Sequence, residues 1–227
     1  LGSEGRSEQT LATDQDNALI LRDDLPAARR DALIGFAREV NLALDRCGFP
    51  LCKGGIMAGS IACCMTLAEW SARFRGWIAQ GSPEDLLAAS IFFDFRPLAG
   101  HVALAEQLRS EVLPAAGRTP RFLKQLALNA LGRTPPLNWL GRIDTDPAGR
   151  IDAKLQGTAL WVDAARIYAL AHGIGATNTR ERLLAVGPAL GVARASEFPL
   201  KRLVPASVVL VAAESAADEP TPADALQ

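Results

Sequence analysis

Two acidic residues near the start of the chain have the spacing of a metal site. Asp14 and Asp16 lie in the segment TDQDN and are separated by one residue. On a strand, this spacing points both carboxylates to one face, about 7 Å apart along the chain. Two such carboxylates can share a hard cation such as Mg²⁺, which takes oxygen ligands and bridges substrate phosphates. The spacing therefore predicts a catalytic metal site at Asp14 and Asp16; the alternative is a pair of solvent-facing loop acids.

A second group of residues, just before the acids, is suited to binding phosphate. Gly2 and Ser3 lead into a predicted short helix, and backbone N–H groups and a hydroxyl at such a position can bind an anion. Arg6 can neutralise the charge of the same triphosphate. The alternative for Gly2 and Ser3 is a simple helix cap. Gly2, Ser3 and Arg6 are therefore predicted to bind nucleotide.

The elements around these residues follow from the periodicity of apolar residues. Residues 12–21 alternate polar and apolar and end in four apolar residues, which predicts a buried strand. Residues 23–48 predict a helix with Pro26 near its start. From Met65 onward the spacing is almost entirely helical, and the longest helix is expected over 152–174.

The pattern changes along the chain and predicts an α+β fold that is mainly α. An α/β piece is expected over 1–62, a helical bundle over 63–200, and a disordered tail over 201–227, where helical periodicity is lost. Within the bundle, Asp163 and Arg166 are three residues apart and can form an ion pair on one helix face.

Composition excludes several classes of protein. The chain has 227 residues, of which 49% are hydrophobic, and a formal net charge of −1. This balance argues against a nucleic-acid partner or a membrane partner. The longest apolar run, VPASVVLVAA, is too short to cross a bilayer. Four cysteines fit neither a paired zinc motif nor a disulfide framework, which predicts reduced thiols and a cytoplasmic location.

The segment GSEGRSEQTLATDQDNALI resembles the nucleotidyltransferase core of the DNA polymerase β superfamily. Within it, the chain is similar to the nucleotidyltransferases related to the PII-protein uridylyltransferase. The likeness continues through CGFPLCKGGIMA, LAEWSARFRGWI, SIFFDFRPLAG and DAKLQGTALWVDAARIYALAHGI and covers roughly residues 1–185.

The resemblance implies a catalytic α/β domain, incomplete here at its N-terminus, followed by a helical substrate-binding domain. It implies that Gly2 and Ser3 hold a nucleoside triphosphate and that Asp14 and Asp16 bind Mg²⁺. The expected reaction is attack of an acceptor hydroxyl, such as one on a signalling protein, on the nucleotide α-phosphate. The resemblance also implies cyclic-nucleotide-binding or CBS domains upstream in the full-length protein.

One feature of the superfamily has no counterpart in this chain. Active members add a third carboxylate from a later strand, but GFPLCKGGIMAG, where that strand is expected, contains no acid. Asp94 is a candidate replacement, with Arg96 as a phosphate contact, if the helical domain folds back over the cleft. The alternative is that Asp94 and Arg96 form a local pair. Lys53, beside two glycines, is either a phosphate contact or a solvated turn residue.

Two hypotheses about function follow. The first is a Mg²⁺-dependent nucleotidyltransferase that transfers a nucleoside monophosphate to an acceptor, in the manner of a uridylyltransferase. The second is a catalytically inactive module that binds nucleotide and transmits a signal. A plain helical interaction domain is a third possibility, but it leaves the opening segment unexplained.

Overall fold

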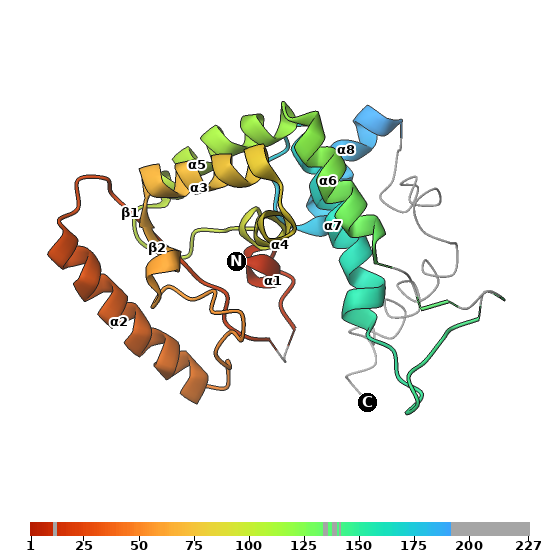
Figure 1. Ribbon diagram of the computed structural model, residues 1–227, viewed down its shortest axis with the longest axis horizontal. Coiled ribbons are helices and arrows are strands. Elements are labelled where there is room, and N and C mark those ends of the chain that lie inside the picture. Colours follow the sequence, from red (N-terminus) through yellow and green to blue (C-terminus); the bar gives the residue numbers. More distant parts are fainter. Residues whose placement is uncertain (11–12, 134–135, 138–139, 141, 192–227) are drawn as a thin grey trace, which may run out of the picture.

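The computed structural model describes residues 1–10, 13–133, 136–137, 140 and 142–191 (Figure 1). The statements that follow concern these residues. The tail predicted over 201–227 lies outside them, as do the last residues of the predicted helical domain.

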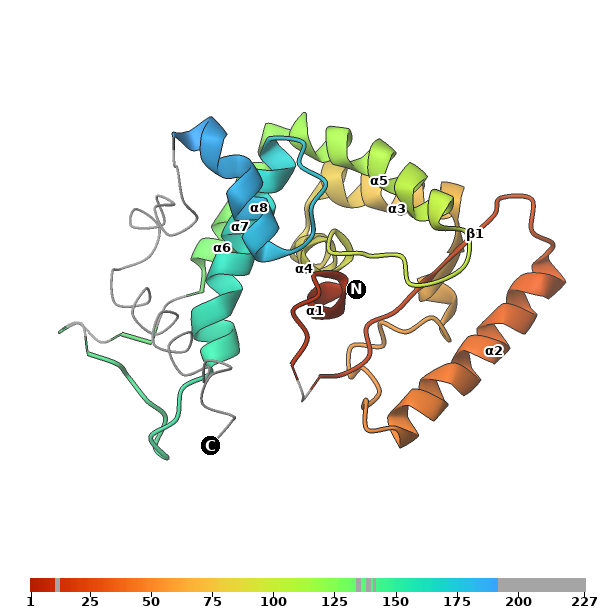
Figure 2. The ribbon, with the colours of Figure 1, turned by 180° about the vertical axis from the view of Figure 1, so that it is seen from behind.

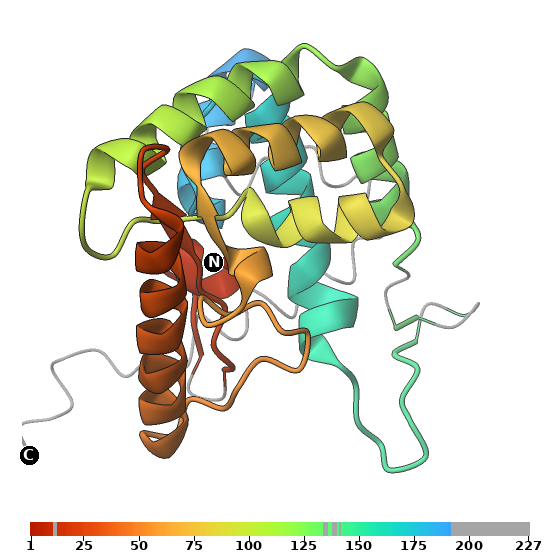
Figure 3. The same ribbon diagram turned by 60° about the vertical axis from the view of Figure 1, so that its left-hand side comes forward.

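The N-terminal part contains a small parallel sheet. It begins with the short helix α1 (Gly2–Gly5), followed by strand β1 (Leu19–Leu21) and helix α2 (Ala27–Arg46). The second strand, β2 (Cys64–Thr66), pairs with β1 so that Ile20 lies opposite Met65. Parallel strands need a long crossover connection, and α2 lies within that connection, standing beside the sheet (Figure 3).

The rest of the described chain is helical. The elements after α2, apart from β2, are η1 (Ile61–Cys63), α3 (Leu67–Gln80), α4 (Pro83–Phe92), α5 (Val102–Gly117), α6 (Pro120–Leu131), the π-helical segment η2 (Lys154–Thr158), α7 (Ala159–Ala171), α8 (Thr179–Val186) and η3 (Gly187–Leu190). Thr66 and Ser82 start α3 and α4 with capping boxes. In each box the hydroxyl accepts a hydrogen bond from the backbone N–H three residues later, and the acidic side chain of that residue accepts one from the backbone N–H of Thr66 or Ser82. Gly81 ends α3 in the left-handed conformation, with φ +66°.

An aromatic core joins the sheet to the helices. Trp70 and Phe74 of α3 are almost fully buried and pack against Phe92 and Phe93 at the end of α4. The indole N–H of Trp70 donates a hydrogen bond of 2.9 Å to the carbonyl of Leu19 in β1. Because a buried indole N–H needs a partner, this bond fixes α3 to the strand that follows the acidic pair.

The predicted α+β, mainly α fold class is confirmed. The strand predicted over 12–21 is confirmed only at Leu19–Leu21. Strand β2 was not predicted, because the sequence from Met65 onward was interpreted as almost entirely helical. The expectation of the longest helix over 152–174 was wrong, since α2 has 20 residues and α7 has 13. In the described part of the chain, no helix has the length and apolar character needed to span a bilayer. The domain boundaries at residues 62 and 200 stay predictions.

Candidate functional site

Buried amides hold the acidic pair in place. Gln15 and Asn17, which alternate with the two acids, both hydrogen-bond Asn41 of α2: Asn41 Nδ2 donates to Gln15 Oε1 at 2.8 Å and to Asn17 Oδ1 at 3.0 Å. Gln15 is 6% exposed and donates from Nε2 to the backbone carbonyl of Asn41 and to that of Phe49, each at 2.8 Å. Because successive side chains of an extended segment point to opposite sides, anchoring the amides directs Asp14 and Asp16 to the other side.

The segment that carries the acids runs beside residues 50–56. The backbone N–H of Gln15 donates to the carbonyl of Pro50, and that of Asn17 to the carbonyl of Ile56, each at 3.1 Å. This pairing brings Cys52 to the acids. One ligand atom from each of Asp14, Asp16 and Cys52 lies within 4.8 Å of the other two. The predicted convergence of the two acids is therefore present, with a thiol as its third member.

The electrostatics of this group reflect partial burial. Burial raises the pKa of the Asp16 carboxyl, and a hydrogen bond from the Cys52 thiol and the positive charge of Lys154 on η2 oppose that shift. Burial likewise raises the pKa of Cys52. Asp14 is exposed. The group thus combines one solvent-accessible carboxylate with two less accessible ligands, a set that can bind a divalent cation.

The structure brings the Gly2–Ser3 segment to the acids. A Cβ atom added at Gly2, whose φ is +54°, would lie 3.3 Å from Asp16 Oδ2. The amino group of Leu1 donates a hydrogen bond of 2.8 Å to the backbone carbonyl of Asp16. Gly2 and Ser3 form the first residues of α1 rather than a turn before it. The predicted phosphate-binding and metal-binding elements are therefore neighbours.

Both predicted arginine contacts bind acidic side chains. Arg6 donates to Glu8 and to Asp94, at 2.7 Å in each case. Arg96 donates to the backbone carbonyl of Glu4 at 3.2 Å and also pairs with the Glu4 carboxylate. The local pairing of Asp94 with Arg96 was therefore wrong, because α1 lies close enough to bind Arg96. Lys53 is exposed in a turn.

Asp94 lies at the centre of a buried ion cluster. It is 0% exposed, and its carboxylate lies 2.7 Å from Arg6, 2.6 Å from Arg166 of α7 and 2.7 Å from Arg182 of α8. Burial alone would raise the pKa of Asp94, but Arg166, Arg182 and Arg6 together hold it well below its usual range. Asp94 is not among the three residues whose ligand atoms meet. Its expected role as a replacement third metal-site acid finds no support in this geometry.

The same cluster joins α1 to the helical part of the chain. Arg166 also pairs with Asp163 at 2.6 Å, which confirms the ion pair predicted from their spacing. Asn178, at the start of α8, donates from Nδ2 to the carbonyl of Arg6 at 3.0 Å. Figure 2 shows α1 below α4, with α7 and α8 to one side. Residues far apart in sequence thus meet around Asp94.

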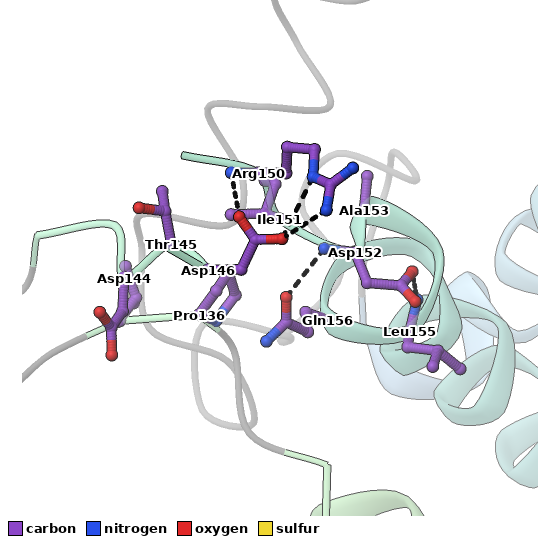
Figure 4. Close-up of a pocket in the computed structure, with 11 residues that line it drawn as sticks. Pro136, Asp144, Thr145, Asp146, Arg150, Ile151, Asp152, Ala153, Leu155 and Gln156 are labelled. Carbon is purple, nitrogen blue, oxygen red and sulfur yellow. Dashed lines mark hydrogen bonds and ion pairs between the residues drawn. The ribbon is translucent and has the colours of Figure 1, made fainter. Parts of the chain in front are cut away.

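A separate hollow of about 1020 Å³ is lined by residues other than the acids. Its lining includes Asp146, which binds Arg150, and Asp152 beside the start of η2 (Figure 4). None of the predicted site residues lines it. The hollow is large, but its Asp146–Arg150 ion pair is exposed to solvent, and size alone is weak support for a functional site. We therefore place the candidate site at Asp14 and Asp16.

A mainly helical fold with a small parallel sheet, and a Gly-Ser segment beside an acidic pair, fit the nucleotidyltransferase core that the sequence resembles. Two family models match the chain: "Putative nucleotidyltransferase DUF294" over residues 1–84 and "Putative nucleotidyltransferase substrate binding domain" over residues 120–197. Together they cover more than half of the chain, and the chain belongs to this family. Comparisons with curated proteins and with solved structures gave no significant match.

Sequence reasoning missed Cys52 as a member of the site and Lys154 as a charge that acts on it. Cys52 was noted only as a reduced thiol, although it lies in the very segment where the third acid was expected. Lys154 was assigned to the helical bundle, although its charge acts on Asp16. The position of Cys52 in GFPLCKGGIMAG was a usable signal. No local pattern connects Lys154 to Asp16, which precedes it by 138 positions.

Proposed function

We propose that the chain is a Mg²⁺-dependent nucleotidyltransferase that moves a nucleoside monophosphate from a nucleoside triphosphate to a hydroxyl on a protein acceptor, as a uridylyltransferase does. The observation that carries the proposal is the approach of Gly2 to the Asp16 carboxylate, within a group that also contains Asp14 and Cys52. This closeness supports a shared site in which Gly2 and Ser3 contact phosphate and the acids hold a metal. Family membership supports the same reaction class.

In this proposal, Asp14 and Asp16 hold the cation, and the backbone and hydroxyl of Gly2–Ser3 contact the triphosphate. The cation, when bound, neutralises charge on the phosphates and orients them for in-line attack. The acceptor oxygen forms a bond to the α-phosphorus, the bond from that phosphorus to the bridging oxygen breaks, pyrophosphate leaves, and the hydroxyl proton passes to solvent. The proposal assigns the exposed Lys53 as a further phosphate contact, while Arg6 and Arg96 hold α1.

The direct test is transfer of label from each of the four nucleoside triphosphates, labelled in the α-phosphate, with Mg²⁺ and a cell lysate as the source of acceptor. The full chain should incorporate label and release pyrophosphate. The double variant Asp14→Asn, Asp16→Asn should lose both signals. Asp24→Asn is the matched control, because Asp24 is an exposed acid that pairs with Arg22. Labelling that is unchanged in the double variant would sink the proposal.

The second function, an inactive nucleotide-binding module, is favoured by one observation: no third carboxylate lies with Asp14 and Asp16 among the described residues. It predicts saturable nucleotide binding by calorimetry and no pyrophosphate release with any nucleotide. Measurable pyrophosphate production that requires Asp14 and Asp16 excludes it.

A further inference from the structure

The segment that lacks the expected acid supplies a thiol instead. Cys52 begins a tight turn in which the N–H of Gly55, with φ +70°, donates to the Cys52 carbonyl at 3.0 Å. The turn points the sulfur toward the acids, because Sγ is the Cys52 atom that lies within 4.8 Å of both carboxylates. Cys52 is 9% exposed, so a small part of it is open to solvent.

The backbone encloses the sulfur closely, since a Cβ on Gly54 would lie 3.6 Å from Sγ. Burial raises the pKa of the Cys52 thiol, and the nearby backbone N–H groups of Ile56 and Gly54 oppose that shift. Backbone N–H donors to a sulfur stabilise a thiolate and fix its direction, as do the outer hydrogen bonds of protein metal sites. The other cysteines differ: Cys63 and Cys64 are buried in hydrophobic clusters, and Cys47 is exposed.

The spacing suits a small, thiophilic cation. Bonds of about 2.0–2.3 Å around a tetrahedral Zn²⁺ place neighbouring ligand atoms roughly 3.3–3.7 Å apart. The three ligand atoms, already within 4.8 Å of one another, need only small side-chain rotations to reach those separations. Thiolate ligands select Zn²⁺ and similar ions, whereas Mg²⁺ requires oxygen ligands in octahedral geometry.

We propose that Cys52 is a third metal ligand and that Asp14, Asp16 and Cys52 together bind Zn²⁺ in preference to Mg²⁺. On binding, the S–H proton leaves to buffer and a sulfur–metal bond forms, so one proton is released from the thiol for each ion bound. Mg²⁺ uses the two carboxylates and leaves the thiol protonated. The inference shares these two acids with the proposed function, and it makes Zn²⁺ a competitor of Mg²⁺ at the same site.

The test uses the full chain without nucleotide and Co²⁺ or Cd²⁺ as spectroscopic substitutes for Zn²⁺. Both ions give a thiolate-to-metal charge-transfer absorption band when sulfur is a ligand. The band should appear in the unmodified chain and in Cys47→Ser, and it should be absent in Cys52→Ser. Loss of a residue that only hydrogen-bonds a metal ligand weakens metal binding about 10–100-fold. Because Cys52 is proposed to bind the metal directly, Cys52→Ser should weaken Cd²⁺ binding by at least about tenfold. Cys52→Asp should weaken Cd²⁺ binding and strengthen Mg²⁺ binding.

A second measurement keeps the proposal testable if Cys52→Ser fails to fold. In the unmodified chain, Zn²⁺ should protect Cys52 from iodoacetamide, as measured by peptide mass spectrometry, while Cys47 stays reactive. A band that persists in Cys52→Ser, no band at saturating Co²⁺, or equal alkylation of Cys52 with and without Zn²⁺ each overturns the proposal. Failure of nucleotidyl transfer leaves these readouts unaffected, because none of them uses nucleotide.

Discussion

The substitution Asp94→Asn removes the one carboxylate that the buried Arg166 and Arg182 and the partly buried Arg6 share. An amide has nearly the same shape but no charge, so Arg6, Arg166 and Arg182 lose their common counterion. Removing one partner of a buried ion pair typically costs about 3–5 kcal/mol, because the other charge stays buried without compensation. Asp163 and Glu8 still pair with two of the arginines. We therefore expect the free energy of unfolding to fall by about 3–5 kcal/mol.

Urea unfolding, followed by circular dichroism and tryptophan fluorescence, measures this loss. The total stability of a domain is about 5–15 kcal/mol, so the expected change is a large part of it. Asp24→Asn is the control, because Asp24 and Arg22 are both about two-thirds exposed and such pairs contribute less than about 1 kcal/mol. A loss for Asp94→Asn that is no larger than the loss for Asp24→Asn would refute the reasoning.

The stability difference between the unmodified chain and Asp94→Asn should depend on pH. The pKa of Asp94 in the folded chain lies below its usual value of about 3.9. Its contribution to stability is therefore complete above about pH 4 and declines as the pH falls toward the folded pKa. The difference in unfolding free energy between the unmodified chain and Asp94→Asn should stay constant from about pH 7 to about pH 5 and narrow below about pH 4. If the difference in unfolding free energy grows as the pH falls, the lowered pKa of Asp94 is contradicted.

Three further substitutions test how the site is held. Gly5→Ala should lower the free energy of unfolding by about 1–3 kcal/mol or more, because a Cβ there would lie 1.8 Å from the Asp94 backbone carbonyl oxygen. The control is Gly35→Ala on an open face of α2, which should raise the free energy of unfolding by up to about 1 kcal/mol. Urea unfolding measures both changes. Asn41→Ala should cost about 1–3 kcal/mol for each partner left unpaired and should weaken Co²⁺ binding in a spectroscopic titration. Lys154→Gln should weaken binding of Mg²⁺–nucleoside triphosphates by up to about fivefold in calorimetry, with unchanged unfolding, because it removes an exposed positive charge near Asp16 that attracts the anionic triphosphate.

The parts of the site that sequence predicted are those set by local spacing. Asp14 and Asp16 share a face because they are two residues apart in an extended segment, and no distant residue is needed to infer it. Helix α2 was predicted from its apolar period and Pro26, and it begins directly after that residue. The two acids and Gly2 were predicted to form one site, and the structure brings them together.

The parts that sequence did not predict depend on distant contacts. Strand β2 has only three residues, Cys64–Thr66, and is defined by its pairing with β1 rather than by a pattern of its own. Asp94 binds arginines 72 and 88 residues away. A local interpretation paired it with Arg96 two residues on, which instead binds Glu4. No periodicity within one segment reports such partners.

The position of α1 shows how the two halves of the site depend on different parts of the chain. A helix of four residues is not stable by itself, so its place must come from tertiary contacts: Gly5 packs on the Asp94 backbone, Arg6 binds the Asp94 carboxylate, and Arg96 binds Glu4. The acids, in contrast, are held by Asn41 of α2. Since Asp94 is itself fixed by arginines of α7 and α8, the helical part of the chain sets where the proposed phosphate-binding segment lies relative to Asp14 and Asp16. Under the proposed function, a movement of α7 or α8 therefore changes nucleotide binding while leaving the two acids in place.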